Sequence, residues 1–250
     1  MDPGAGGALM DALSGTIEWL TTADNWWGPA GIVQRIWEHL QYSLLAVGLA
    51  VLIALPAGLV IGHTGRAEPG AFALSGAARA VPTLGLLVLL GRWYPVQAWP
   101  VVIVLAVLAI PPILANTTAG IGGVDPAVRD AAQGMGMTPL QVLTRVEVPL
   151  AAPLILAGIR SALLQVIATA TIAAFAGLGG LGRFIIDGFA VSDDARVYGG
   201  SIVVAVLALL GEGLFALAQR SVRPAGLRRR RPPLLPVAVP IPPTAGGIST

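Results

Sequence analysis

The side chains that usually carry out covalent chemistry are almost absent from this sequence. It contains no lysine and no cysteine, and its only histidines are His39 and His63. The missing lysine excludes a phosphate-binding P-loop of the GxxxxGK[ST] type and Schiff-base catalysis. The missing cysteine excludes disulfides and zinc–thiolate sites, and two histidines so far apart cannot form an HExxH metal site. We therefore expect no catalytic residue, no metal and no cofactor, and we do not expect this chain to be an enzyme.

The polar stretch 125–149 is the most informative part of the sequence. It reads DPAVRDAAQGMGMTPLQVLTRVEVP and has hydrophobic segments on both sides. Neighbouring helices of a bundle are usually joined by about two to eight residues, so this connection is much longer than a hairpin needs. We therefore expect another molecule to use it.

Local signals within this stretch predict two short helices joined by a tight turn. Asp125 can accept hydrogen bonds from the free N–H groups of a helix start, and the proline after it suits the first helical position, which predicts a helix over Pro126–Gln133. Gly134 and Gly136 can adopt the positive φ angles of a turn. A second helix is expected from residue 139 to about residue 145. The small residues that would let a partner approach closely are Ala131, Ala132 and Gly136.

The amino-acid composition indicates the environment in which this chain folds. Of the 250 residues, 55% are hydrophobic and only 11% are charged, and the mean hydropathy is +0.79. A soluble domain has roughly 25% charged residues, so this chain has too little charge to cover a globular surface in water. The net charge of +2 adds little to this picture. We expect an integral membrane protein.

Hydrophobic segments separated by polar connections predict an all-α bundle with five membrane spans. A helix of about twenty residues crosses a hydrocarbon core of about 30 Å. Gly58 and Gly62 form a GxxxG pair that either lets another helix approach closely or is incidental in a glycine-rich chain. The predicted spans are approximately residues 36–62, 77–91, 99–115, 150–175 and 197–218, within a transmembrane domain over residues 36–220.

The two ends of the chain predict its orientation. Residues 1–35 carry acids and tryptophans, and they form either an external interfacial segment or a loosely ordered tail. Residues 221–250 are rich in arginine and proline and are expected to be a disordered cytoplasmic tail, in which Arg228–Arg231 contacts anionic membrane lipid and not nucleic acid. Because arginines favour the inner side of a membrane, we expect the N-terminus outside, and the C-terminus and the stretch 125–149 in the cytoplasm.

Several polar residues lie within the predicted spans, among them Arg160, Gln165, Thr169 and Glu212. A charge such as that of Arg160 costs at least a few kcal/mol inside a membrane unless its side chain reaches the interface or faces water. Arg160 therefore lies near the interface, packs against a neighbouring helix, or takes part in transport. Gln165 and Thr169 either line a passage or bond to a neighbouring helix. Glu212 is expected to lie at the inner interface, the alternative being a pairing with a basic group.

The spacing of residues within the stretch 125–149 matches a known signature. Asp130-Ala131-Ala132 is followed by Gly136 and then by Val146-x-Val148-Pro149. This pattern resembles the EAA signature of permease subunits in bacterial ABC importers, with Asp130 in place of the usual glutamate. The resemblance implies that the two short helices dock in a groove of a cytoplasmic ATPase subunit and transmit its closure to the spans. The residues it implies for ATPase coupling are Asp130, Ala131, Ala132, Gly134, Gly136 and Pro149.

Further segments are similar to one branch of these permeases. GMGMTPLQVLTRVEVPLAAPLILAGIRSA, AGLGGLGRFIIDGF and RAVPTLGLLVLL look like permeases of the osmoprotectant branch, which import glycine betaine, choline, carnitine or proline. The likeness covers roughly Trp37–Ala218. It implies a methionine-importer-like core in the bacterial inner membrane and a second permease subunit, identical or paralogous. It also implies a cytoplasmic ABC ATPase dimer, which would hydrolyse the ATP, and an extracytoplasmic substrate-binding protein.

Other functions stay open at this point. An ABC permease for methionine shares the same small five-span plan. A secondary transporter or channel would show an internal repeat and ionisable groups deep in several spans. A membrane scaffold without transport activity would leave the spacing from Asp130 to Pro149 unexplained.

The segment Gly177–Gly182 matches the dinucleotide fingerprint GxGxxG. That motif needs a preceding strand in a βαβ unit, whereas a predicted transmembrane helix precedes it here. We therefore expect no nucleotide to bind there. The segment is either a flexible exit from the fourth predicted span or an external surface that meets the substrate-binding protein.

Overall fold

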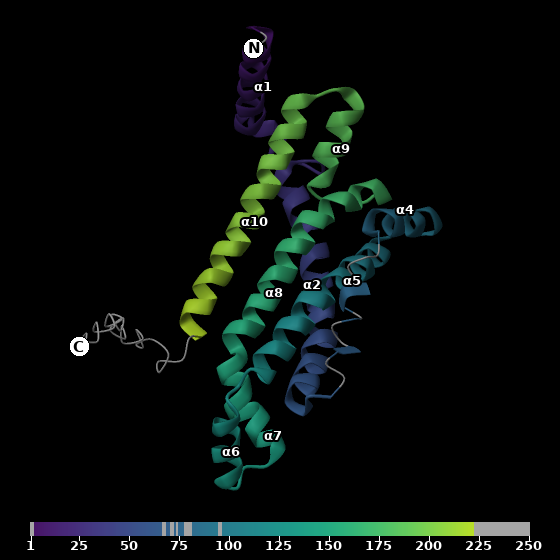
Figure 1. The fold of residues 1–250 in the computed structure, drawn as a ribbon. Helices are drawn as coiled ribbons and strands as arrows, with labels where there is room; N and C mark the ends of the chain where they lie inside the picture. Colours follow the sequence, from purple (N-terminus) through teal and green to yellow (C-terminus); the bar gives the residue numbers. More distant parts are fainter. Residues whose placement is uncertain are drawn as a thin grey trace, which may run out of the picture.

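The computed structural model describes residues 3–222 except for residues 67, 68, 71, 72, 74, 78–81, 95 and 96. Within this described part the secondary structure is helical and includes no β-strand, which confirms the predicted all-α class. The long helices lie side by side along one direction (Figure 1).

Two pairs of short or peripheral helices mark the ends of this bundle. One end carries α6, Pro126–Gly134, and α7, Pro139–Val142 (Figure 1). We call these two helices the knob. The opposite end carries α1, Pro3–Thr21, and α9, Gly182–Val191.

Within the described part of the chain, four helices are long and apolar enough to cross a membrane. They correspond to four of the five predicted spans, and each runs further than predicted, because the helices continue into the polar connections. They are α2 (Ile32–Thr64), α5 (Ala98–Gly122), the run Pro139–Phe175 that contains α8 (Val148–Ala170), and Asp194–Gln219 within α10 (Asp194–Val222).

The predicted span 77–91 differs from the others. Its residues 78–81 lie outside the described part of the chain, and the described helix that follows is α4, Thr83–Trp93, with 11 residues. A helix of this length reaches roughly 16 Å, about half of a hydrocarbon core. α4 runs across the direction of the long helices in Figure 1 and packs against α5 and against the short turn Thr171–Ala176.

The core lies around α5, which packs between α2 and α8. Its position requires small residues on its neighbours. A Cβ atom built on Gly58 would lie 2.7 Å from Cβ of Thr117, and one built on Gly62 would lie 2.7 Å from Cβ of Ile121. These distances are shorter than side chains tolerate, so the GxxxG pair is a helix-packing surface. Of the two predicted alternatives for this pair, close packing is confirmed.

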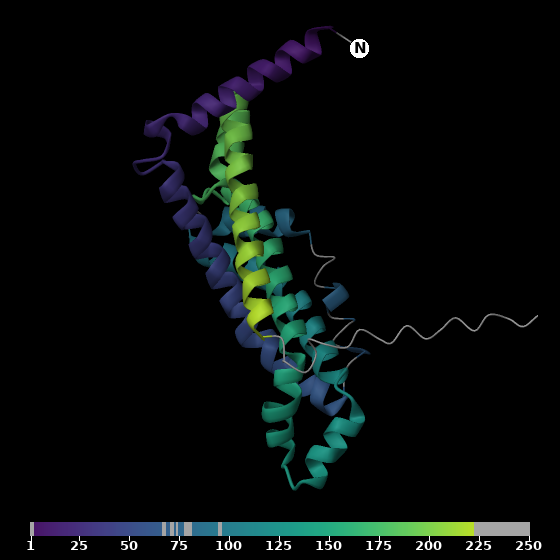
Figure 2. The ribbon, with the colours of Figure 1, turned by 90° about the vertical axis from the view of Figure 1, so that its left-hand side faces the viewer.

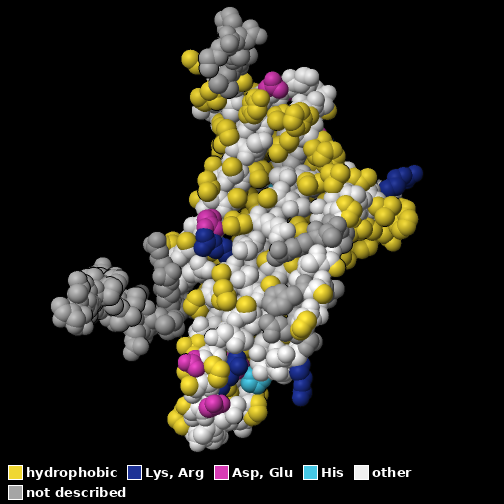
Figure 3. Space-filling model, viewed as in Figure 1, with side chains coloured by type: hydrophobic (Ala, Val, Ile, Leu, Met, Phe, Trp, Pro, Cys, Tyr) yellow, Lys and Arg dark blue, Asp and Glu magenta, His cyan; other side chains and the backbone are white. Residues whose placement is uncertain are grey.

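The outer face of the bundle is hydrophobic along its length. Figure 3 shows hydrophobic side chains over much of the long face, and charged and histidine side chains near the end with α6 and α7, with further charged side chains halfway along the bundle, beside α4 and at the opposite end. Only 6% of the most hydrophobic window of α10 is buried, against 61% for α5. Such a surface fits a hydrocarbon environment or a second copy of a membrane subunit. Exposed large side chains on α2 and α10 include Leu44, Leu45, Leu52, Val206, Leu209, Leu210 and Leu214.

The N-terminal residues form a helix and a closed turn. α1 lies across the end of α10 in Figure 2 and packs against it. In the turn that follows, the Trp26 indole N–H donates to the carbonyl of Leu20 at 2.7 Å, and the Asn25 amide donates to the carbonyl of Trp19 at 2.8 Å. For these residues the structure favours an ordered segment over a loose tail. The predicted disordered tail falls mainly on residues 223–250, which lie outside the described part.

Candidate functional site

The knob is built by the local signals present in its sequence. The Asp125 carboxylate accepts from the N–H of Ala127 at 2.9 Å and caps α6. Gly136 adopts a φ of +83°, which a residue with a side chain rarely does, and turns the chain between the helices. A capping box then starts α7, because the backbone N–H of Thr138 donates to the Gln141 side chain at 2.8 Å and the Thr138 hydroxyl accepts in return. The predicted pair of helices is confirmed.

Two details of the predicted knob are wrong. Gly134 is the last residue of α6 and has no positive φ, so Gly136 alone provides the left-handed turn. The second helix does not end near Arg145. It continues through a π-helical turn, Leu143–Glu147, directly into α8. The knob is therefore continuous with a membrane helix on one side.

The structure sorts the predicted coupling residues into exposed and buried positions. Ala132 is only 2% exposed, so it lies inside the knob, and its predicted place on the docking surface is wrong. α6 packs against α7 and against the π-turn Leu143–Glu147. The remaining predicted coupling residues are exposed, and they are Asp130, Ala131, Gly134 and Gly136 in the knob and Pro149 at the start of α8.

Sequence reasoning missed two hydrophobic side chains at the tip of the knob. Met135 is 73% exposed and Leu140 is 68% exposed, and they flank the turn at Gly136. Large apolar side chains on an exposed tip are typical of a contact surface. Their positions beside a predicted turn could have identified them, because turn residues lie on the surface.

A buried carboxylate lies where the knob joins the membrane helices. Glu147 is 0% exposed, and its Oε2 lies 2.7 Å from Nδ1 of His63. Its Oε1 lies 2.7 Å from Nε of Arg129, a residue of α6. Arg129 also donates through Nη2 to the carbonyl of Ile121 near the end of α5. Sequence reasoning gave no role to any of these residues, because the contacts join segments far apart in the chain.

The polar residues of α8 are not gathered into one site. Arg160 donates through Nε to Oε2 of Glu212 on α10 at 2.6 Å, and through Nη1 to Gln219 at 3.0 Å. The favoured interpretation of Glu212 as an unpaired interfacial group is thus wrong, because the close packing of α8 and α10 brings the two charges together. Gln165 and Thr169 are partly buried and make no side-chain hydrogen bond within the described residues.

The glycine-rich segment at the opposite end is a closed turn. The N–H of Gly180 donates to Oε2 of Glu38 at 2.7 Å. A Cβ atom on Gly182 would overlap the carbonyl of Thr171, so the chain can pass there only as glycine. Close packing explains Gly182, and positive φ angles of +79° and +89° explain Gly177 and Gly180, so the structure favours an ordered turn over a flexible exit. A helical turn precedes the segment, so the fold lacks the strand that a dinucleotide motif needs.

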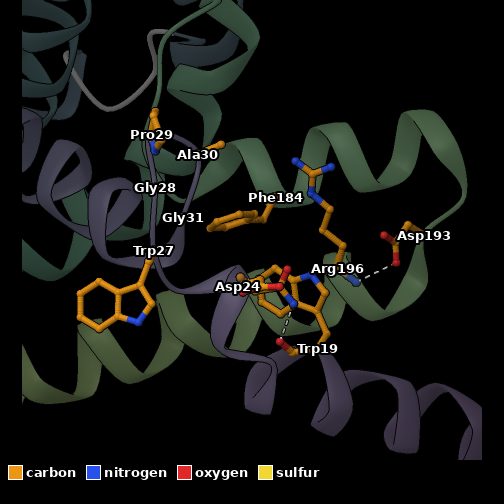
Figure 4. A pocket seen from close by; sticks show the side chains of 11 residues that line it. Trp19, Asp24, Trp27, Gly28, Pro29, Ala30, Gly31, Phe184, Asp193 and Arg196 are labelled. Atoms are coloured by element: carbon orange, nitrogen blue, oxygen red, sulfur yellow. Dashed lines mark hydrogen bonds between the residues drawn. The ribbon is translucent and has the colours of Figure 1, made fainter.

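A pocket of about 510 Å³ lies between residues 19–31, α9 and the start of α10 (Figure 4). Its aromatic wall is formed by Trp19 and Phe184, whose ring centroids lie 5.2 Å apart in an edge-to-face arrangement. The guanidinium of Arg196 lies 5.7 Å from the centroid of the Phe184 ring. We call this the outer pocket. Further residues that line it include Asp24, Asn25, Trp27, Gly28 and Asp193. Among the described residues no cluster of three or more histidines and acids could hold a metal ion.

Comparison with known families decides what this architecture is. Residues 35–224, most of the chain, match the family described as "Binding-protein-dependent transport system inner membrane component". The chain belongs to this family. The protein is therefore a permease subunit of a binding-protein-dependent ABC importer, and a multi-pass protein of the inner membrane. This confirms the interpretation drawn from the Asp130–Pro149 spacing and sets aside the scaffold and the secondary transporter.

Individual relatives of the permease are similar along most of their length. It is 37% identical to the choline transport system permease protein OpuBB of Bacillus subtilis, over 79% of this chain and 91% of the relative. It is 34% identical to the carnitine transport permease protein OpuCB of Listeria monocytogenes, over 80% and 92% of the two chains. It is also 34% identical to the osmoprotectant import permease protein OsmW of Salmonella typhimurium, over 76% and 91%.

The permease fold is also found in a solved structure. A chain of the methionine ABC transporter MetNI in an inward-facing conformation superposes with a TM-score of 0.67 at 20% identity, covering 77% of this permease and 96% of that chain. At this identity the likeness concerns the fold alone. The predicted methionine-importer-like core is confirmed as an architecture.

Proposed function

We propose that this permease is the membrane subunit of an ATP-driven importer for osmoprotectants, which are quaternary amines such as choline, carnitine and glycine betaine, or proline. One observation carries the proposal. Relatives named for choline, carnitine and osmoprotectant transport are 34–37% identical to it over more than nine tenths of their own length. The methionine alternative rests on a fold likeness at 20% identity.

The knob is the part that we assign to ATPase coupling. Its exposed face combines the Asp130 carboxylate, small residues, and the apolar side chains of Met135 and Leu140. Such a face can enter a groove of a cytoplasmic ATPase, with the apolar tip as the buried anchor. The knob then lies in the cytoplasm, and the N-terminus outside. Alternating access follows if the ATPase dimer binds one conformation of the permease more tightly than the other, because only differential affinity shifts an equilibrium.

The opposite end then faces the extracytoplasmic substrate-binding protein. The outer pocket and the closed Gly177–Gly182 turn form a fixed surface there, with charged and aromatic side chains suited to a transient contact. Selectivity for a quaternary ammonium group resides in the binding protein, where an aromatic cage can use cation–π attraction. The permease itself contributes no ATP hydrolysis, because it lacks the lysine of a phosphate-binding loop.

Two permease subunits, identical or paralogous, enclose the translocation pathway. The hydrophobic surface of α10 supports this, because so little of its apolar window is covered within one chain. In such a pair the partly buried Gln165 and Thr169 of α8 are available as pathway-lining residues, whereas Arg160 is engaged by Glu212.

Substrate competition tests the proposed function. Vesicles containing the complete complex are given labelled glycine betaine and ATP, with an excess of unlabelled choline, carnitine, proline or methionine. We expect ATP-dependent uptake that choline or carnitine reduces and methionine leaves unchanged. Strong competition by methionine alone, or uptake that needs no ATP, would overturn the assignment.

A further inference from the structure

Glu147 is a fully buried carboxylate at the junction between the knob and α8. It is 0% exposed and ends the π-turn Leu143–Glu147. Removing a carboxylate from water costs several kcal/mol unless cations and hydrogen-bond donors surround it. Single π-turns inside longer helices are frequent at functional positions. The burial of a charge at this point therefore calls for a specific role.

The two partners of Glu147 come from two other elements. His63 belongs to the last turn of α2, and its Nδ1 lies 2.7 Å from Oε2. Arg129 belongs to α6, and its Nε lies 2.7 Å from Oε1. One carboxylate thus bridges a membrane helix and the knob, although His63 and Glu147 are 84 positions apart.

The same cluster includes the end of α5. Arg129 donates to the carbonyl of Ile121, one residue before α5 ends at Gly122. Gly62, the neighbour of His63, lets this end of α5 approach α2, because a Cβ atom there would lie 2.7 Å from Cβ of Ile121. The ends of α2 and α5, the start of α8 and the knob therefore meet around Glu147.

We propose that Glu147 is a positioning residue for coupling, which makes the ends of α2 and α5 follow the knob when the ATPase moves it. This role rests on the ATPase coupling proposed above. The chain runs directly from α5 into the knob and from the knob into α8, whereas α2 has no direct connection to the knob. A buried carboxylate held by Arg129 and His63 has few alternative arrangements, since separating it from Arg129 leaves an unpaired charge in the interior. The cluster thus moves as one body.

A positioning role differs from a docking role in what its loss would change. Glu147 has no exposed surface, so it cannot touch the ATPase, whereas Asp130 is exposed on the knob. Loss of Asp130 should weaken association with the ATPase. Loss of the Glu147 charge should leave association intact and reduce the amount of substrate moved per ATP hydrolysed.

The first test compares three carboxylate-to-amide variants in vesicles that hold the complete complex, with labelled glycine betaine as the probe. For Glu147→Gln we expect unchanged co-purification of the ATPase. The amount of substrate transported per ATP hydrolysed should fall by roughly fivefold or more, because a fivefold effect is the lower end of the usual range for coupling between two sites. Asp130→Asn is the docking control and should reduce co-purification. Glu212→Gln is the control for a paired carboxylate remote from the knob and should keep the wild-type ratio. An unchanged ratio for Glu147→Gln, or a loss of association like that of Asp130→Asn, would overturn the proposal.

A second test does not depend on the folding of Glu147→Gln. The chain has no cysteine, so spin labels can be placed on Thr64→Cys at the end of α2 and Gln133→Cys on α6, both of which are exposed positions. We expect the same distance between the labels in the nucleotide-free and ATP-bound complexes. A distance that changes between these states would show that α2 does not follow the knob, and would overturn the proposal.

The two proposals fail in different ways. If the wild-type complex takes up none of the osmoprotectants, the proposed function is wrong. If it takes them up and Glu147→Gln couples normally, only the role of Glu147 is wrong.

Discussion

Arg160 on α8 and Glu212 on α10 form an ion pair in which Nε of Arg160 donates to Oε2 of Glu212 at 2.6 Å. The same guanidinium donates to Gln219 at 3.0 Å. Both charged residues belong to helices that can cross a membrane, where an unpaired charge costs several kcal/mol. We interpret the pair as a packing contact between α8 and α10 that holds the outermost long helix to the core.

Removing one partner of this pair should destabilise the protein. We expect Glu212→Leu to lower the free energy of unfolding by about 1–3 kcal/mol, because it leaves the Arg160 guanidinium without its main acceptor. The double variant Arg160→Met/Glu212→Leu should recover most of the loss, since two apolar side chains can replace an ion pair. Thermal unfolding of the detergent-solubilised complex measures both effects. A double variant that is stable but transports no substrate would instead assign Arg160 to the translocation pathway.

Gly182 should be irreplaceable for packing reasons. A Cβ atom there would overlap the backbone carbonyl of Thr171, which cannot rotate away as a side chain can. We expect Gly182→Ala to lower the free energy of unfolding by about 1–3 kcal/mol, the usual cost of overpacking. Gly48→Ala in α2 is the matched control, because a Cβ atom there meets nothing within 4 Å and alanine favours a helix. Equal unfolding temperatures for both variants would contradict the tight turn.

The exposed hydrophobic tip of the knob should be needed for ATPase binding. We expect Met135→Glu/Leu140→Glu to reduce co-purification of the ATPase about tenfold or more, because hydrophobic anchors at the centre of an interface contribute most of its affinity. Both side chains are exposed, so the stability of the permease itself should change little. As a control, Met10→Glu places a charge on α1, at the opposite end of the bundle, where Met10 is 72% exposed. If both variants retain the ATPase equally, the tip is not the contact.

Structural features that depend only on residues close together in the chain were predictable from the sequence. Asp125 before a proline, and Thr138 three positions before Gln141, define the starts of α6 and α7 through contacts within a single turn. Long apolar segments likewise identified the membrane helices. Local reasoning also located the left-handed turn at Gly136, although it assigned the same role to Gly134.

Features that depend on packing were not predictable in this way. The contacts of Glu147 with His63 and of Arg160 with Glu212 join residues 84 and 52 positions apart, so no periodicity relates them. The π-turn was missed because the second short helix was expected to end at about residue 145 and the fourth span to begin at about residue 150. Proline lacks the N–H that would bond to the carbonyl of Arg145 in a regular α-helix. The N–H of Val148 instead bonds to the carbonyl of Leu143, so the helix continues without interruption.

ATP-driven uptake by a Gly136→Val complex tests most directly whether the knob couples transport to a separate ATPase. Gly136 has a φ of +83°, a conformation that a β-branched residue avoids at a cost of about 1–3 kcal/mol, and no atom contacts its Cβ position, so the change is confined to the turn. We expect uptake of labelled glycine betaine and co-purification of the ATPase to fall together, while the amount of permease in the membrane stays at the wild-type level. Unchanged uptake with unchanged association would contradict the coupling role of the knob.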